Sequence, residues 1–391
     1  MKYNFNKTPN RKGTGSFKWD MTDALYGQSD MLPLWVADMD FPSPKCVIDA
    51  VTARAKQGVY GYACLPDDYL PAICDWFAAR HSFAIQPEWI VPTPSVVPAV
   101  NFLVQEFTHE GEGVIIMPPV YYPFANAIKN NGREMIENPL AFNGERYTPD
   151  IEDLEKKAAQ PNVKMLILCS PHNPVGRVWL PEELSAIAKI CARHGVLIVS
   201  DEIHCDLVFS KHKHTPMPLA ASPDAQIICC YSASKTFNLP GLSSAYMVVA
   251  DETLRRRIKG RQEMCGIYGV NVFGPLAQTA AYRGGADWLT QVLQYIWGNY
   301  ETTRNFLQQH LPDVKPIEPE GTYLLWLNFL STGLTADELK TKLRVNARVA
   351  LDEGDMFGYG GEGFARVNLA CSRKLLLEAL EKIRQVFTRS L

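Results

Sequence analysis

The sequence lacks any apolar run approaching the ~20 residues that a membrane-spanning helix needs. It also lacks long runs of like charge, and its formal net charge of -3 argues against a surface built to bind nucleic acid. The first residues, Met1–Asn6, contain no apolar segment of the kind found in signal peptides. We therefore expect a cytoplasmic protein that binds neither membranes nor nucleic acid.

The sequence also lacks C-x-x-C motifs, because its ten cysteines are scattered and none of them forms one. Several of them, such as Cys169, Cys229 and Cys230, lie inside apolar runs typical of strands. Cysteines of this kind behave as small buried hydrophobic residues in a reducing compartment. We expect neither a disulfide framework nor a metal site.

The middle of the chain alternates short apolar runs with a helical pattern. These runs are continuous, as expected for strands buried on both faces of a mainly parallel sheet. One helix is predicted over Pro181–Cys191, with a proline and two acids at its start and Gly195 beyond its end. The order predicts a three-layer α/β domain with predicted strands at Val114–Met117, Met165–Cys169, Val196–Val199, Ile227–Cys230 and Ala245–Val249.

The pattern changes near residue 286, which divides the 391 residues into three parts. We expect an N-terminal segment over 1–45 that packs on the small domain or a partner subunit, a large domain over 46–285, and a small α+β domain over 286–391. The small domain is predicted to contain helices at Trp288–Leu311 and Ala336–Leu343, strands at Thr322–Phe329 and Phe364–Leu369, and a last helix from about Lys374.

A lysine follows one of the predicted buried strands, in the run Ser232-Ala233-Ser234-Lys235. Burying an ammonium group costs free energy, so such a lysine usually has a partner or a chemical role. A desolvated lysine forms a Schiff base with a carbonyl, and pyridoxal phosphate is the common carbonyl cofactor. A solvated lysine in an ordinary loop is the alternative.

Two further polar residues follow predicted strands, Asn173 after Met165–Cys169 and Asp201 after Val196–Val199. Ligands of open parallel sheets bind at the carboxyl ends of the strands, so these side chains and Lys235 are expected to meet there. A carboxylate at Asp201 would keep the pyridine nitrogen protonated, and Asn173 could hydrogen-bond the phenolic oxygen. The alternatives are a helix cap for Asp201 and a turn residue for Asn173.

The phosphate and the ring of the cofactor need their own partners. A helix that starts near Ser95 would offer the amides of Ser95, Val96 and Val97 to an anion, although Ser95 could simply cap that helix. Ser232 and Ser234 add hydroxyl groups. Tyr121, after the first predicted strand, could stack on the cofactor ring, while a core position is the alternative.

These residues together resemble the fold-type-I pyridoxal-phosphate enzymes of the class I/II aminotransferase superfamily. The motifs that carry the resemblance are P-x-N-P-x-G at 171–176, Asp201-Glu202, S-x-S-K at 232–235 and a C-terminal Arg366. A narrower resemblance is to the MalY/PatB-like cystathionine β-lyases, or C–S lyases. Its residues are Lys18-Trp19-Asp20, Trp35–Pro42, Gly58–Tyr62 and Ser200–His204.

The resemblance implies a role for each of these residues. Lys235 would be the Schiff-base lysine and catalytic base, with Asp201, Asn173 and Tyr121 as its cofactor-binding neighbours. Tyr62 would reach the phosphate of a neighbouring subunit, which implies a homodimer with shared active sites. Arg366 would bind the substrate carboxylate, as a bidentate guanidinium can, and Ala37 would also contact the substrate. A surface position is the alternative for Arg366.

Two positions depart from the general aminotransferase pattern, and both agree with the C–S lyase subgroup. Where many aminotransferases have tyrosine three residues after the aspartate, this chain has His204, which would contact the cofactor or only pack beside it. Where many have arginine eight residues after the lysine, it has Ser243. The phosphate would then depend on serines, backbone amides and Tyr62.

The implied function is a lyase that cleaves L-cystathionine or related cysteine S-conjugates into a thiol such as homocysteine, pyruvate and ammonia. An aminotransferase is the main alternative, although the second substrate-binding arginine of an aspartate-like enzyme is not identifiable. A further alternative is a lyase that also binds a transcription regulator. A cofactor-free structural relative is disfavoured by the intact set of Lys235, Asp201 and Asn173.

Overall fold

The computed structural model describes residues 1–267 and 269–388. A seven-stranded sheet forms its centre, in the order β2-β10-β9-β8-β7-β3-β4, and β10 runs opposite to the other six strands. All five predicted strands are present in this sheet. Its strands are β2 (Ile90–Thr93), β3 (Gly113–Ile116), β4 (Glu134–Glu137), β7 (Val163–Cys169), β8 (Leu197–Asp201), β9 (Ile227–Tyr231) and β10 (Ala245–Val248).

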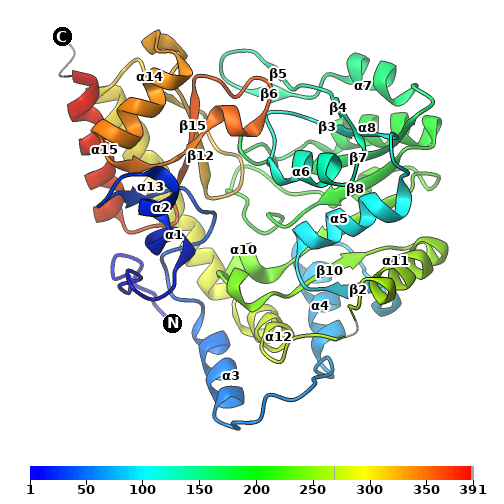
Figure 1. Cartoon of the computed structure of the whole chain (residues 1–391). Helices are drawn as coiled ribbons and strands as arrows, with labels where there is room; N and C mark the ends of the chain where they lie inside the picture. Colours follow the sequence, from blue (N-terminus) through cyan, green and yellow to red (C-terminus); the bar gives the residue numbers. More distant parts are fainter. Residues whose placement is uncertain (268, 389–391) are drawn as a thin grey trace.

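Helices cover both faces of this sheet, which accounts for the continuous apolar runs (Figure 1). In β7, Met165 and Ile167 pack toward one group of helices, whereas Leu166 and Leu168 pack toward the other. The first group is α5 (Val96–Phe107), α6 (Pro123–Asn130) and α11 (Glu252–Met264); the second includes α4 (Tyr69–His81), α7 (Ile151–Ala158) and α8 (Pro181–His194). The three-layer α/β prediction is therefore confirmed.

A smaller antiparallel sheet lies in the C-terminal part of the chain. Its order is β11-β12-β15-β14, with β11 (Lys315–Pro316), β12 (Leu324–Asn328), β14 (Asp352–Glu353) and β15 (Phe364–Asn368). The helices beside it are α13 (Ala286–His310), α14 (Ala336–Lys340) and α15 (Arg373–Thr388). The helix expected over Ala336–Leu343 ends at Lys340 and continues as a π-helical turn over Thr341–Asn346.

The N-terminal segment lies on this C-terminal part. Its short strand β1 (Leu32–Pro33) pairs in parallel with β13 (Val349–Ala350), and the Asn368 amide donates to the Leu34 carbonyl at 2.9 Å. The segment includes two short helices, α1 (Phe17–Asp20) and α2 (Thr22–Tyr26). This pairing brings Ala37, just after β1, toward the large sheet.

Ion pairs between four charged side chains join the beginning of the N-terminal segment to its end. Lys18 is completely buried and donates to Asp40 at 3.0 Å, while its ammonium lies 3.6 Å from Asp38. Arg11 donates to the same two carboxylates at 2.6 Å and 2.8 Å. Two cations and two anions therefore neutralise one another where the segment enters the core.

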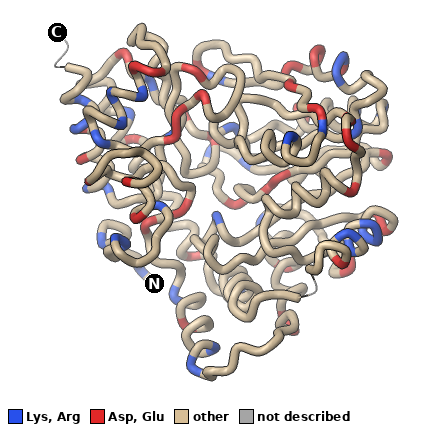
Figure 2. The backbone as a smooth tube through the Cα atoms, in the orientation of Figure 1, with Lys and Arg blue, Asp and Glu red and all other residues tan. Residues whose placement is uncertain are grey.

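The remaining helices and strands connect these parts. Lys and Arg are interspersed with Asp and Glu along the chain (Figure 2). No helix in the described ranges combines the length and the apolar character needed to cross a bilayer. The connecting elements are α3 (Lys45–Ala55), α9 (Met217–Ala220), α10 (Ala233–Phe237), α12 (Gly274–Gly284), β5 (Ala141–Phe142) and β6 (Tyr147–Thr148).

Candidate active site

A cavity of about 230 Å³ opens at the carboxyl ends of the parallel strands β7, β8 and β9. Asp201 is the last residue of β8, Asn173 lies four residues beyond β7, and Lys235 follows β9 in the first turns of α10. The structure thus brings together side chains that the strand order predicted would meet. The predicted residues on the cavity wall are Ala37, Ser95, Val96, Val97, Tyr121, Asn173, Asp201, His204, Ser232, Ser234 and Lys235.

Lys235 points its ammonium group at the N-terminal segment, where Nζ donates to the Ala37 carbonyl at 2.7 Å. Burial lowers the pKa of this amine to about 8, and the positive charge of Arg366 acts in the same direction. The charges of Asp38 and Asp201 oppose the shift only in part. The uncharged, nucleophilic amine is therefore a much larger fraction of Lys235 near neutral pH than it is of an ordinary lysine.

Asp201 is a buried carboxyl group with few partners of its own. Its Oδ1 accepts a hydrogen bond from the Ile203 amide at 3.1 Å in a turn, and the next helix begins only at Met217, so Asp201 is not the helix cap considered as its alternative. Burial raises the pKa of Asp201 to about 7, against the lowering effects of that hydrogen bond and of Lys235. A buried carboxyl of this kind fits a cationic ligand group, such as a protonated pyridine nitrogen, that would stabilise its charged form.

Asn173 links the cavity to the strand that carries Arg366. Its Oδ1 accepts a hydrogen bond from Nη1 of Arg366 at 2.9 Å, and its backbone amide donates to Sγ of Cys169 at 3.4 Å. Because the amide oxygen is already used, the side chain presents its NH₂ group as a donor. That donor fits a phenolate oxygen on a ligand in the cavity.

One end of the cavity is suited to an anion. Ser95 adopts an extended conformation as the N-cap of α5, and its side chain makes no capping hydrogen bond. The hydroxyl and the first amides of this 12-residue helix are therefore available to a phosphate. Ser232 is partly committed, because its hydroxyl accepts from the Ser234 amide at 3.0 Å and donates to the Ser244 carbonyl at 2.7 Å.

His204 and Tyr121 are uncharged walls of the cavity. Burial, together with the charges of Lys235 and Arg366, lowers the pKa of His204 well below its usual value. Its Nδ1 is buried without a hydrogen-bond partner, and its ring meets the Tyr323 ring edge-on at 6.1 Å. Burial also raises the pKa of the Tyr121 phenol above its usual value. Both groups can thus contact a ligand without adding charge.

Arg366 reaches the cavity through Asn173 and is held from behind. Asp352 is its direct neighbour on the adjacent strand β14, and the two side chains form a buried ion pair. Nη2 also donates to the Trp35 carbonyl at 3.1 Å, and the guanidinium lies 5.0 Å from the centre of the Phe357 ring. Its Nε is buried without a partner. This is a rigid, cationic group suited to a carboxylate.

Two predicted site residues do not line the cavity in the single chain: Arg366, which donates to the wall residue Asn173, and Tyr62. Its side chain is fully exposed, as are most of Val59 and Tyr60 beside it. Some residues that line the cavity, or that support its wall, were not predicted from the sequence. Tyr323 donates to the Ala37 carbonyl at 2.8 Å, and Ser244 lines the cavity beside Ser243. The pairing of Asp352 with Arg366 depends on strand register, for which the sequence offers no signal.

Known proteins resemble the chain over nearly all of its length. The family model for aminotransferase class I and II matches residues 29–383. The cystathionine beta-lyase PatB of Bacillus subtilis is 41% identical over 382 residues, covering 97% of this chain and 99% of that protein. The protein MalY of Escherichia coli is 35% identical over 379 residues, covering 96% of each chain.

Solved structures agree with these relatives. Cystalysin from Treponema denticola, whose crystal structure contains a pyridoxal 5'-phosphate cofactor, matches with a TM-score of 0.97 at 34% identity over 100% of each chain. The pyridoxal-phosphate-bound C–S lyase from Staphylococcus hominis matches with a TM-score of 0.91 at 29% identity, covering 99% of this chain and 98% of that one. The family model and both close relatives lead to one conclusion: the chain belongs to the class I and II aminotransferase family.

Proposed function

We propose that this protein is a pyridoxal-phosphate-dependent C–S β-lyase that converts L-cystathionine or related cysteine S-conjugates into a thiol, pyruvate and ammonia. The observation that carries the proposal is the meeting of Lys235, Asp201 and Asn173 around one cavity. The names of the relatives support the choice of reaction, since PatB is a cystathionine beta-lyase and the Staphylococcus hominis protein is a C–S lyase.

The residues around the cavity match the chemical groups of pyridoxal phosphate, and each would take the role expected for it from the sequence. Lys235 would hold the cofactor covalently, Asp201 would pair with its ring nitrogen, and Asn173 would donate to its phenolic oxygen. Tyr121 and His204 would contact the ring. The first amides of α5, with Ser95 and Ser234, would bind the phosphate. When bound, the cofactor supplies an electron sink for the charge that develops at the substrate α-carbon.

The reaction then depends on how the chain holds the substrate and moves its proton. Arg366, fixed by Asp352 and Asn173, would bind the α-carboxylate. The amine of Lys235 would remove the α-proton, a task suited to a pKa of about 8. The electron pair from the Cα–H bond forms the Cα=Cβ bond while the Cβ–S bond breaks and the thiol leaves. Water hydrolyses the remaining fragment to pyruvate and ammonia.

Pyruvate release tests this function directly. With cystathionine as the sole substrate and no 2-oxo acid present, we expect the purified protein to release pyruvate and a thiol in equal amounts. Lys235→Ala should lose nearly all turnover, while the exposed Lys259→Ala should retain it. Turnover that requires an added 2-oxo acid would instead identify an aminotransferase and refute the lyase.

We further propose a homodimer in which Tyr62 of each subunit reaches the phosphate end of the other subunit's cavity. A second cavity of about 450 Å³ shares Ser243 and Ser244 with the first, and it offers room for a segment of another chain beside the phosphate end. The fully exposed Tyr62 and its largely exposed neighbour Tyr60 form a segment suited to that contact.

A cytoplasmic location completes the proposal. The ten cysteines are unpaired thiols in the described chain, and six of them are buried. Unpaired thiols in this number are typical of proteins from a reducing compartment.

A further inference from the structure

A second buried carboxylate, Asp206, lies in the loop that leads away from Asp201. It is 2% exposed and does not line the cavity; its side chain accepts hydrogen bonds from donors on two helices. From α4, Nε1 of Trp76, Nε of Arg80 and Nε2 of His81 lie 3.1, 3.0 and 2.9 Å from its Oδ1. From α10, the hydroxyl of Thr236 donates to Oδ2 at 3.0 Å.

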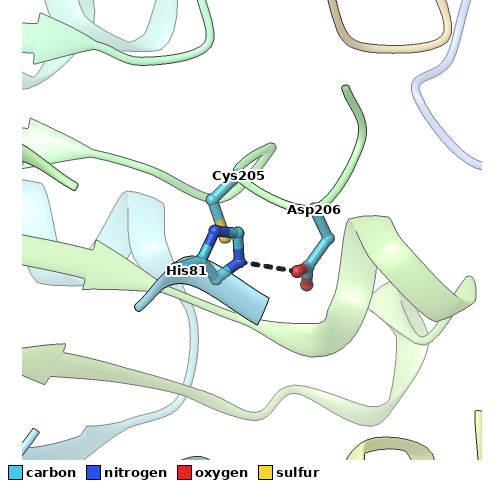
Figure 3. Close-up of side chains that lie close together, drawn as sticks. All are labelled: His81, Cys205 and Asp206. Carbon is cyan, nitrogen blue, oxygen red and sulfur yellow. Dashed lines mark hydrogen bonds and ion pairs between the residues drawn. The ribbon is translucent and has the colours of Figure 1, made fainter. Parts of the chain in front are cut away.

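A metal ion does not fit this cluster, although His81, Cys205 and Asp206 place three potential ligand atoms within 4.8 Å of one another (Figure 3). The guanidinium of Arg80 already occupies the space beside Oδ1 and would repel a cation. Burial and the neighbouring carboxylates raise the pKa of the Cys205 thiol well above its usual value, so it is a poor ligand. The oxygens of Asp206 are fully used by protein donors.

The cluster instead connects two parts of the active site and packs them against α4. Asp206 belongs to the loop that starts at Asp201, and Thr236 is the residue next to Lys235. The helix that carries Lys235 and Thr236, α10, has only five residues, so its own hydrogen bonds do little to fix its direction. Trp76 adds a ring contact to Phe237, the last residue of α10, at 5.6 Å. External contacts must therefore orient this helix.

We propose that Asp206, through its hydrogen bond to Thr236, is a positioning residue that fixes the direction of the Lys235 side chain relative to Asp201. The inference rests on the proposed role of Lys235. Since a displacement of ~1 Å of a reacting group can cost roughly 100-fold in rate, one lost hydrogen bond next to the lysine should be measurable in turnover.

Substitutions at Thr236 test this proposal. Thr236→Val removes the hydroxyl and keeps the shape, whereas Thr236→Ser keeps the hydroxyl and loses a methyl group. We expect Thr236→Val to lower kcat roughly 10- to 100-fold with KM changed less than about twofold, because Arg366 is untouched. Thr236→Ser should stay close to the wild type. Thr303→Val, which removes another buried threonine hydroxyl bonded to the Asn299 carbonyl in α13, should leave kcat unchanged.

A spectroscopic readout separates positioning from folding. In Thr236→Val we expect a shifted absorbance maximum of the covalently bound cofactor and slower cofactor uptake by the apoprotein, with both properties restored in Thr236→Ser. Thr236→Ala, which cannot clash, should repeat the effects of valine because it also lacks the hydroxyl, whereas effects confined to valine would come from misfolding and would overturn the inference. Equal losses in the serine and valine variants, or a valine variant with normal kcat and absorbance, would overturn the inference.

Failure of the proposed function is distinguishable from failure of this inference. Borohydride reduction of the wild type followed by peptide mapping identifies the lysine that carries the cofactor. A label on another lysine would refute the role of Lys235 itself. A label on Lys235 with an unaffected Thr236→Val variant would refute only the positioning role.

Discussion

Two influences lower the pKa of the Lys235 amine and two raise it. Burial and Arg366 favour the neutral amine, whereas Asp38 and Asp201 favour the charged one. The first pair prevails and leaves the pKa of Lys235 at about 8, below the usual value for a lysine. The chain thus prepares this amine for reaction with a carbonyl before any ligand binds.

The pH dependence of cofactor uptake follows from that pKa. Below pH 8 the uptake rate should rise about tenfold per pH unit, because the neutral fraction of Lys235 rises by that factor, and above pH 8 it should level off. Mixing apoprotein with pyridoxal phosphate and following absorbance from pH 6 to pH 10 measures the curve. A rate that still rises steeply between pH 9 and pH 10 would contradict the lowered pKa.

The raised pKa of Asp201 predicts that the apoprotein becomes less stable as the pH rises, whereas its uptake of the cofactor becomes faster. Its folded pKa of about 7 exceeds the ~3.9 of an unfolded chain, so the folded state holds the extra proton between these values. The contribution of Asp201 to stability is therefore lost as pH rises from about 4 to about 7, by roughly 4 kcal/mol at most. Since Asn does not titrate, Asp201→Asn apoprotein should gain on the wild type across this range.

Thermal unfolding of the two apoproteins at pH 4.5 and pH 7.5 measures the difference. Added pyridoxal phosphate should reverse the order, because only the wild type pairs its carboxylate with the ring nitrogen. An Asp201→Asn advantage that is the same at both pH values would contradict the raised pKa.

The sequence was informative about residues that directly follow strands and uninformative about those that support them. Asn173, Asp201 and Lys235 were predicted to meet because strand ends share one edge of a sheet. Asp352 and Asp206 were missed, since their partners Arg366 and Thr236 lie across a strand register and a helix contact. Such contacts depend on packing between distant segments, which has no local pattern.

At the scale of elements, continuous apolar runs were reliable because each inner strand is buried on both faces. The antiparallel direction of β10 had no counterpart in its composition, and the π-helical turn after α14 interrupted a regular helical pattern. The N-terminal segment was the least predictable element. Buried charges and one short strand hold it in place, and neither has a periodic signature.

The buried charge cluster of that segment predicts a measurable loss of stability. Lys18→Met removes one cation that Asp40 needs, and breaking a buried ion pair typically costs about 3–5 kcal/mol. We expect a cost near the lower value, since Arg11 still pairs with Asp40. Urea unfolding measures it, and limited proteolysis should then cleave the first 40 residues faster.

The matched control is Lys45→Met, which removes the same side chain from an exposed ion pair with Asp49. Exposed pairs of this type contribute little to stability. Equal losses in the two variants would argue that the buried cluster does not hold the segment.

At the scale of the whole molecule, the cavity combines parts that are distant in the sequence. The N-terminal segment contributes Ala37, and the large domain contributes Asn173, Asp201 and Lys235. Arg366 of the small sheet supports the wall from behind through its hydrogen bond to Asn173. The proposed homodimer would add Tyr62. In the proposed homodimer, the site is complete only when both sheets and a second subunit are assembled.

Mixing two inactive variants tests the shared site. Lys235→Ala and Tyr62→Ala homodimers should each be impaired, but a mixed dimer contains one site with both intact residues. Random exchange of equal amounts should recover about a quarter of the wild-type sites. The measurement is pyruvate release after denaturation and joint refolding, compared with separately refolded variants. Absence of any recovery, with dimers present, would argue that Tyr62 acts within its own subunit.

The pairing of β1 with β13 also bears on the order of events during synthesis. Leu32 and Pro33 leave the ribosome early, but their partners Val349 and Ala350 emerge more than 300 residues later. Domains tend to fold as they are made, so the large sheet has time to form while the first forty residues still lack their docking strand. We expect a nascent chain to display Lys235 without the Ala37 wall, and the amine to be enclosed only as translation ends.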